Sequence, residues 1–199
     1  MTIILGLTGS IGMGKSTVAA MFRKQGVPLF DADAEVRRMQ GPGGVLLGAI
    51  EQLHPGTTGP DGVDRALLGA AVLGDRSALR RLEQLIHPQV EKARRAFLRR
   101  HRARRLVVVD VPLLFEKGGW RRVDLIAVVS APAWKQNKRV LGRDGMSWKK
   151  LEQLRALQLA DPAKRRRADF VIATGGSLHA TRTAVRRVIH ACKGAAIGG

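Results

Sequence analysis

The sequence predicts an α/β fold, with a parallel sheet flanked by helices on both faces. Short apolar runs typical of buried parallel strands alternate with longer stretches that repeat apolar residues at helical spacing. Hydrophobic residues make up 45% of the 199 residues, which is enough for a sizeable core in one domain. Five apolar runs are predicted strands: residues 3–7, 27–30, 106–109, 125–129 and 170–173.

The segments between these strands are predicted to be mostly helical. Pro88 is expected to mark a kink or the start of a new helix. Residues 41–63 mix Gly, Pro and Thr around a short helical stretch at 45–53 and are expected to be the least regular part. The last residues, 193–199, are expected to form a disordered tail. The other predicted helices cover residues 15–25, 34–40, most of 64–105, 133–143, 147–159 and 178–192.

Charge and cysteine content limit the possible functions. The chain has 35 Lys plus Arg against 16 Asp plus Glu, a net charge of +19, which fits a nucleic-acid surface, a highly anionic small substrate or an Arg-rich solvated surface. The single cysteine, Cys192, excludes an intrachain disulfide and a cysteine zinc cluster, and favours a reducing compartment. No apolar stretch approaches the ~18 residues of a membrane span, so a cytoplasmic location is expected.

A phosphate-binding loop is the strongest motif. Residues 9–16, GSIGMGKS, match G-x-x-x-x-G-K-[ST] between a predicted strand and a predicted helix. The glycines let the backbone curl so that its N–H groups point inward, and the helix adds its positive end. Lys15 would reach the β and γ phosphates, and the Ser16 hydroxyl would bind Mg²⁺. The sequence therefore predicts a three-layer P-loop NTPase fold with an ATP site at Gly9, Ser10, Ile11, Gly12, Met13, Gly14, Lys15, Ser16 and Thr17.

Three aspartates follow predicted strands. Asp110 ends the run LVVVD, at the sheet edge where ligands bind, and is the candidate second Mg²⁺ ligand, with a helix cap or turn as the alternative. Asp31 and Asp33 follow the second strand. Asp33 is the candidate base that would orient an acceptor hydroxyl, whereas Asp31 is expected to cap the next helix.

Two arginines are candidate catalytic cations. Arg139 and Arg143 are four residues apart, on one face of a predicted helix that a flexible Asp-Gly turn follows. A basic helical lid that folds over ATP would exclude water and supply positive charge. A solvated basic surface helix is the alternative.

With these residues in view, the sequence resembles the dephospho-CoA kinases. The matching segments, in order, are LTGSIGMGKSTVA at 7–19, FDADAEVRR at 30–38, IHPQV at 86–90, VVVDVPLLFE at 107–116, RVLGRDGMS at 139–147 and QLADPAKRRRADFVIATGGS at 158–177. The resemblance implies transfer of the γ-phosphate of ATP to the ribose 3′-hydroxyl of dephospho-CoA, the last step of CoA synthesis. It implies Asp33 as the base and Arg139 with Arg143 in the lid.

The same resemblance implies an arrangement of parts within a single kinase domain, 1–199. The nucleotide-binding core would comprise residues 1–40, 105–135 and 160–192, with a helical substrate subdomain at 62–104 and a lid at 136–158. Arg38 and His87 would lie near the acceptor, although a histidine before a proline is often only a hydrogen-bonded cap. ATP, Mg²⁺ and dephospho-CoA are the expected ligands, and the chain is expected to be a monomer or weak oligomer that binds neither nucleic acid nor membrane.

The sequence departs from the family pattern in two places. Ala173 and Thr174 stand where a VIDN pattern usually has Asp and Asn, which puts the usual asparagine contact in doubt. Ser10 and Met13 replace the commoner Gly and Ser of the loop, where no essential side chain is needed. Two alternative functions remain. One is another small-molecule or nucleoside monophosphate kinase. The other is a nucleic-acid-stimulated ATPase, which the net charge of +19 and the seven arginines of residues 94–105 suggest.

Overall fold

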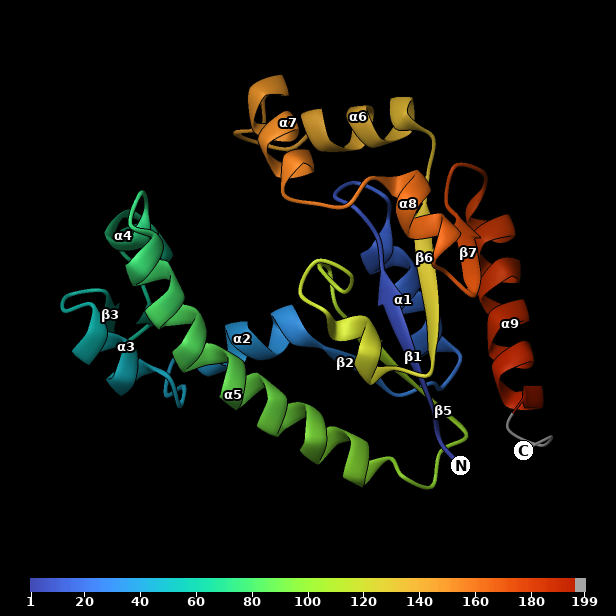
Figure 1. Ribbon diagram of the computed structural model, residues 1–199, viewed down its shortest axis with the longest axis horizontal. Helices are drawn as coiled ribbons and strands as arrows, with labels where there is room; N and C mark the ends of the chain where they lie inside the picture. The colour runs from blue at the N-terminus through green and yellow to red at the C-terminus, as the bar shows by residue number, and fades with distance from the viewer. Residues whose placement is uncertain (196–199) are drawn as a thin grey trace. The chain divides into compact units, whose positions relative to one another are not determined.

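A computed structural model describes residues 1–195 and contains a five-stranded parallel sheet in the order β2-β5-β1-β6-β7 (Figure 1). The central strand, β1, places Leu5 opposite Val108 of β5 and Gly6 opposite Ile126 of β6. The predicted α/β class is confirmed. The strands of this sheet are β1 (Ile3–Thr8), β2 (Leu29–Asp31), β5 (Leu106–Asp110), β6 (Leu125–Ser130) and β7 (Phe170–Ala173).

Helices connect these strands, and several begin at a side chain that caps them. Asp31 accepts a hydrogen bond from Ala34 N–H, and Ser147 accepts one from Lys150 N–H, so each satisfies an N–H group that the helix leaves free. A small hairpin pairs β3 (Thr58–Gly59) with β4 (Gly62–Val63). The helices are α1 (Lys15–Lys24), α2 (Ala32–Gln40), α3 (Leu47–Leu53), α4 (Arg65–Val72), α5 (Arg76–Arg100), η1 (Gly119–Arg122), α6 (Ala133–Leu141), α7 (Trp148–Ala156), α8 (Asp161–Arg166) and α9 (Leu178–Ala195).

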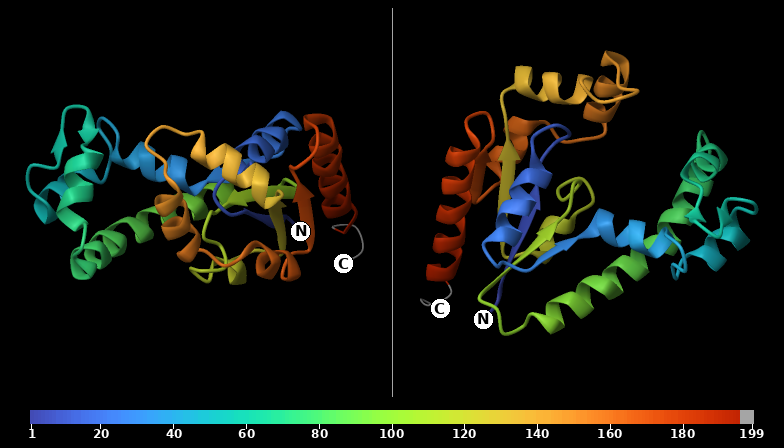
Figure 2. Two further views of the ribbon diagram at one scale, coloured as in Figure 1. Left: turned by 90° about the horizontal axis from the view of Figure 1, so that it is seen from above. Right: turned by 180° about the vertical axis from the view of Figure 1, so that it is seen from behind.

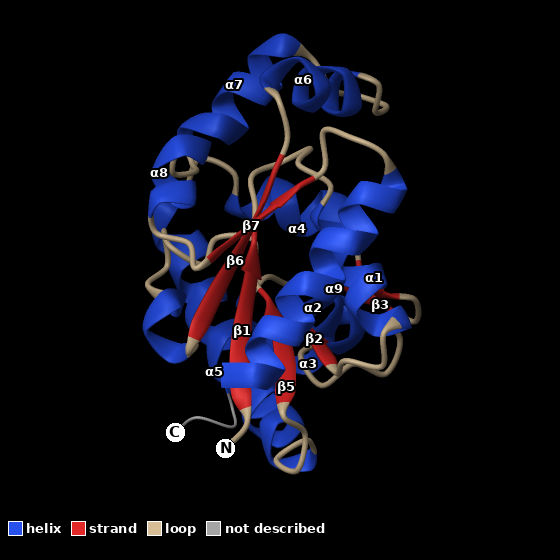
Figure 3. Cartoon of the chain, turned by 90° about the vertical axis from the view of Figure 1, so that its right-hand side faces the viewer, coloured by secondary structure: helices blue, strands red, loops and turns tan. Residues whose placement is uncertain are grey.

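The sheet is buried on both faces because its side chains alternate between them. Ala127 and Val129 of β6 belong to a core that α1 and α9 cover. Ile126 and Val128 point to the other face, where they pack with Leu114 of the loop after β5. Figure 3 shows α8 on the side of the sheet opposite α1 and α9. Three layers result, as the sequence predicts.

The chain divides into two compact units, which we describe separately. The first unit comprises residues 1–30 and 100–199 and contains the sheet core. The second comprises residues 31–99 and has its own core of Met39, Leu46, Ile50, Leu68 and Leu82. Within this unit, helices α2 and α3 share their core with α4 and α5. Within residues 1–195, none of the helices is long and apolar enough to cross a membrane.

Several local expectations are wrong. Pro88 does not begin a helix, because α5 runs through it without interruption from Arg76 to Arg100. Within 41–63, α3 confirms the short helical stretch expected at 45–53, whereas the β3-β4 hairpin is not among the predicted elements. The short helix α8 is not among the predicted helices. Of the expected disordered tail, residues 193–195 continue α9, and the rest lies outside the described residues.

Candidate active site

The phosphate loop connects β1 to α1 and requires glycine at two positions. Gly12 and Gly14 have φ of +76° and +87°, in the region that side-chain-bearing residues rarely adopt. A Cβ on Gly12 would also lie 2.4 Å from Cγ2 of Val140 in α6, which leaves no room for it. Gly14 is the N-cap of α1, so the loop delivers the chain directly to a helix N-terminus, where anions bind favourably.

Three side chains from distant segments bind the backbone carbonyls of this loop. Gln136 Nε2 donates to Ile11 O at 2.8 Å, Arg139 Nη1 donates to Gly12 O at 3.3 Å, and the Thr174 hydroxyl donates to Met13 O at 2.6 Å. In a trans peptide the C=O and the following N–H point in opposite directions. Holding these carbonyls on one side therefore turns the N–H groups of the following residues to the other side.

The helix α6, which carries two of these donors, lies beyond the carboxyl ends of β1 and β6 (Figure 2, right). A fourth side-chain contact comes from the segment after α7, where Gln158 Oε1 accepts the Ile11 N–H at 3.1 Å. Both polar groups that Ile11 contributes to the loop backbone are thus bonded to glutamine side chains. Arg155 joins them, because its Nη2 donates to Gln136 Oε1 at 2.5 Å.

Lys15 and Asp110 form an ion pair at the base of the loop. Lys15 Nζ lies 2.5 Å from Asp110 Oδ1, and the aspartate side chain is only 3% exposed. The sheet brings them together, since Leu7 of β1 pairs with Asp110 of β5. The pair keeps a partly buried lysine charge next to the loop, where a phosphate could replace the carboxylate as its partner.

Ser16 and Asp110 supply oxygen donors of the kind that Mg²⁺ prefers. Ser16 lies in the first turn of α1 and is exposed, as is Thr17. No group of three or more His, Cys, Asp or Glu suited to a metal occurs within residues 1–195. A hydroxyl and a carboxylate suit Mg²⁺, which is commonly bound by few protein ligands together with substrate phosphates and water.

The two candidate lid arginines do not share a helical face. Helix α6 ends at Leu141, and the Gly142 N–H bonds to Lys138 O, so Arg143 lies in the following turn and is exposed. Arg139 remains in the helix and donates to Gly12 and to Thr174. The expectation of a paired arginine face is therefore wrong, because α6 ends at Leu141, two residues before Arg143.

The second unit holds the remaining candidates. Asp31 caps α2, whereas Asp33 is exposed in the first turn and has no hydrogen-bond or ion-pair partner among residues 1–195. Arg38 is exposed and pairs with Glu35, with Nη2 2.6 Å from Oε1. The contact with Glu35 raises the pKa of Arg38 above its usual value. His87 is exposed on α5.

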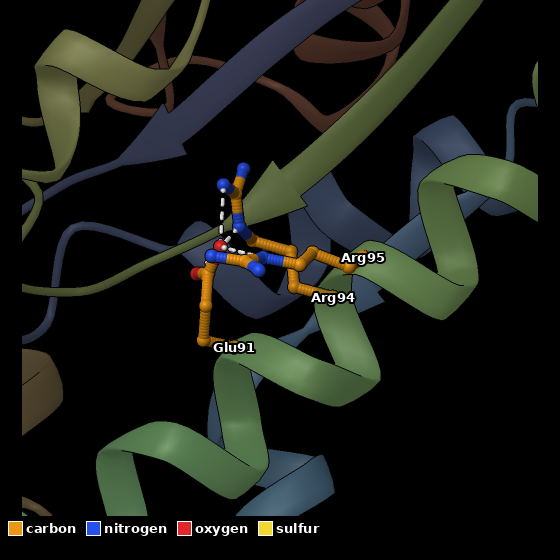
Figure 4. A network of polar contacts seen from close by, with 3 residues as sticks. All are labelled: Glu91, Arg94 and Arg95. Atoms are coloured by element: carbon orange, nitrogen blue, oxygen red, sulfur yellow. Dashed lines mark hydrogen bonds and ion pairs between the residues drawn. The ribbon is translucent and has the colours of Figure 1, made fainter.

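Part of the arginine cluster in α5 is paired within the helix. Glu91 accepts hydrogen bonds from both Arg94 and Arg95, at 3.0 Å and 3.2 Å from their Nε atoms (Figure 4). Arg94 is largely buried against this partner, with 15% of its side chain exposed. One acidic residue thus offsets charge in the segment that suggests nucleic acid, and this weakens that alternative.

A buried ion pair connects the loop after β5 to α8. Lys164 is 0% exposed and its Nζ lies 2.9 Å from Oε1 of Glu116, which also accepts the Leu159 N–H at 2.7 Å. Lys164 Nζ makes no well-aligned hydrogen bond within the described chain, so its buried positive charge is balanced by the negative charge of Glu116. Burial raises the pKa of Glu116, but the contacts with Lys164 and with backbone N–H groups outweigh it, and the pKa is lowered.

Sequence reasoning missed Gln136, Gln158, Thr174 and the Glu116–Lys164 pair. Gln136 lies at a buried position of α6, 5% exposed, so a polar residue on the apolar side of a predicted helix was an available signal. Thr174 was noticed only as a departure from a family pattern. Gln158 offers no such signal, because its contact depends on how the segment after α7 returns to the loop.

Comparisons with known proteins agree with this geometry. A family model described as dephospho-CoA kinase matches residues 3–180. A relative named dephospho-CoA kinase, from Novosphingobium aromaticivorans, is 54% identical over 190 residues, which cover 96% of this chain and 94% of the relative. A crystal structure from Thermus thermophilus is 34% identical, with a TM-score of 0.83, and covers 96% of this chain and 97% of that one. A Campylobacter jejuni dephospho-CoA kinase, 21% identical, shares the fold with a TM-score of 0.68 over 96% of this chain and 97% of that chain.

Proposed function

The chain belongs to the dephospho-CoA kinase family, and we propose that Asp33 is the base of its reaction. The activity is the ATP-dependent phosphorylation of dephospho-CoA, the last step of CoA synthesis. The acceptor is the ribose 3′-hydroxyl, whose proton passes to the Asp33 carboxylate as its oxygen attacks the γ-phosphorus of ATP and ADP leaves.

One observation carries the assignment of Asp33. The two aspartates after β2 have different environments, because Asp31 is occupied as the cap of α2 while the Asp33 carboxylate is exposed and unpartnered among residues 1–195. An unpartnered carboxylate is available to accept a hydroxyl hydrogen bond. Arg38 and His87 belong to the same unit and are proposed to bind the acceptor, within a substrate region at 62–104.

The nucleotide side of the reaction belongs to the loop and to Lys15. The loop N–H groups and the N-terminus of α1 hold the phosphates, and Lys15 neutralises the β and γ phosphates once it leaves Asp110. Ser16 and Asp110 would hold Mg²⁺, which would offset the negative charge of the phosphates. Arg139 and Arg143 add positive charge from a lid at 136–158. A cytoplasmic location and a monomeric or weakly associating state complete the proposal.

The test is Asp33→Asn, with Asp31→Asn as the matched control. Asparagine caps helices as well as aspartate does, so the control should keep most of its activity. Loss of the base should lower kcat by ~10²–10⁴ while ADP binding stays within about twofold. ADP release would be measured with dephospho-CoA, with a 3′-deoxy analogue and with nucleoside monophosphates. An unchanged kcat in Asp33→Asn would remove it as base, and turnover of a nucleoside monophosphate but not of dephospho-CoA would refute the acceptor.

A further inference from the structure

Thr174 occupies a junction between the phosphate loop, the last strand and the lid helix. It directly follows β7, is 6% exposed, and its N–H donates to Ser130 O at 2.8 Å, which anchors its backbone to β6. Its hydroxyl donates to Met13 O at 2.6 Å and accepts from Arg139 Nη1 at 3.1 Å. Its carbonyl accepts from Arg139 Nη2 at 2.7 Å. Arg139 is thus held by two different groups of one residue.

The hydroxyl has one proton, which fixes the direction of this chain of hydrogen bonds. Because that proton is used on Met13 O, the oxygen is free to accept from Arg139, and the sequence of donors runs from guanidinium to hydroxyl to carbonyl. A cationic donor polarises the hydroxyl and strengthens its bond to the loop. Fixing the Met13 carbonyl in turn orients the Gly14 N–H, which shares its peptide plane.

The fit leaves little freedom for the loop. A Cβ on Gly14 would lie 3.2 Å from the Thr174 hydroxyl and 3.4 Å from Arg139 Nη1. Thr174 and Arg139 therefore occupy the space where a side chain would lie on Gly14, the residue at which the loop becomes helix α1. Small displacements of the hydroxyl would be transmitted to the N–H groups at that end.

We propose that Thr174 is a positioning residue for ATP, which sets the loop N–H groups and Arg139 in one geometry for binding the phosphates. The inference rests on the proposed function only in taking the loop to be the ATP site. The position uses a donor and an acceptor from a single side chain, and an asparagine amide, with its NH₂ and C=O groups, also offers both. What the position requires is that pair of groups.

The experiment compares substitutions at Thr174 with the same change at Thr181. Thr181 is a matched control, because it is 2% exposed and, among residues 1–195, its hydroxyl hydrogen-bonds only to the backbone oxygens of Ala173 and Ser177, at 3.2 Å and 3.1 Å. Thr174→Val removes the hydroxyl at nearly constant shape, Thr174→Ser keeps it, and Thr174→Asn supplies an amide. ADP binding would be measured by calorimetry, and steady-state rates with ATP and dephospho-CoA would follow.

Thr174→Val should weaken ADP binding and raise KM for ATP by about tenfold, the range expected for a lost hydrogen bond that involves a charged group. KM for dephospho-CoA should stay within about twofold, and Thr174→Ser and Thr174→Asn should bind ADP within about threefold of the unsubstituted chain. Thr181→Val should lower the melting temperature by about as much as Thr174→Val does, but it should leave ADP binding unchanged.

Equal ADP affinities of Thr174→Val and Thr181→Val would overturn the inference. So would ADP binding by Thr174→Ser and Thr174→Asn that is as weak as that of Thr174→Val. If the valine variant melts too low to measure, Thr174→Ala against Thr174→Ser isolates the same hydroxyl, and equal affinities of these two would overturn it as well. ADP binding does not depend on the acceptor. An unsubstituted chain that binds ADP but does not phosphorylate dephospho-CoA would therefore refute the proposed function and leave the inference standing.

Discussion

Glu116→Gln tests whether the ion pair with Lys164 is a main support of α8. Glutamine keeps the size of the side chain and an oxygen for the Leu159 N–H, but it removes the charge that compensates Lys164. Lys164 has no exposed surface, so its charge cannot turn to water. Leaving one charge of a buried pair uncompensated costs about 3–5 kcal/mol. At about 2–4 °C per kcal/mol for a chain of this length, the melting temperature should fall by about 6–20 °C.

Thermal unfolding followed by circular dichroism at pH 7 is the assay. Glu152→Gln is the control, because Glu152 is exposed on α7, where a surface substitution should change stability by no more than about 0.5 kcal/mol. Adding Lys164→Met to Glu116→Gln should recover much of the loss, since the stranded charge is then gone. A melting temperature for Glu116→Gln within about 2 °C of the unsubstituted chain would refute the reasoning, because such a shift corresponds to only about 0.5–1 kcal/mol.

The pH dependence follows from the lowered pKa of Glu116. Because the folded pKa lies below the usual value of 4.5, folding favours the ionised carboxylate, so the stabilisation is fully present above that pH. It is lost as the pH falls through the folded pKa. Melting curves of the unsubstituted chain and of Glu116→Gln should therefore converge below pH 4.5, and a constant difference down to strong acid would contradict the assigned cause.

Two further predictions follow from the loop and from the last helix. In an ADP-release assay, Lys15→Ala should lower turnover by at least the ~10²–10³-fold typical of one lost electrostatic contact to the transition state. It should also lower the melting temperature, because Asp110 stays buried without its lysine. Near-normal rates would contradict the loop assignment. The Cys192 thiol is 0% exposed, and burial raises its pKa to about 11, so a disulfide reagent at pH 8 should label it only after denaturation. Rapid labelling of the folded chain would mean that α9 is not packed as described.

Much of the fold could be predicted because its signals are local. The apolar run at 106–109 and the periodic residues of α1 identify their elements without knowledge of their neighbours. The loop motif likewise predicts its own strand–loop–helix setting. The wrong expectations are those in which a local rule competes with something else. Pro88 is tolerated inside α5, and Gly142 ends α6 before Arg143.

The rest of the candidate site depends on contacts between segments distant in sequence. Asp110 could be identified as a functional residue, but its pairing with Lys15 follows from the placement of β5 next to β1. Thr174 contacts Met13 across 161 positions of the chain, and no periodicity encodes such a contact. Polar side chains of this kind have no distinctive local pattern, so only the folded arrangement identifies them.

The bond between the Ile11 N–H and Gln158 makes one amide a reporter of the contact between the phosphate loop and the segment after α7. The Ile11 amide proton is protected from exchange with solvent deuterium while it is hydrogen-bonded to Gln158 Oε1. Exchange therefore requires this bond to open. Residue 158 lies two positions after the last residue of α7, so the contact ties the chain just beyond that helix to the phosphate loop. The exchange rate at this one backbone position therefore reports how often the Gln158 contact opens, in the unmodified chain and without a dye or a spin label.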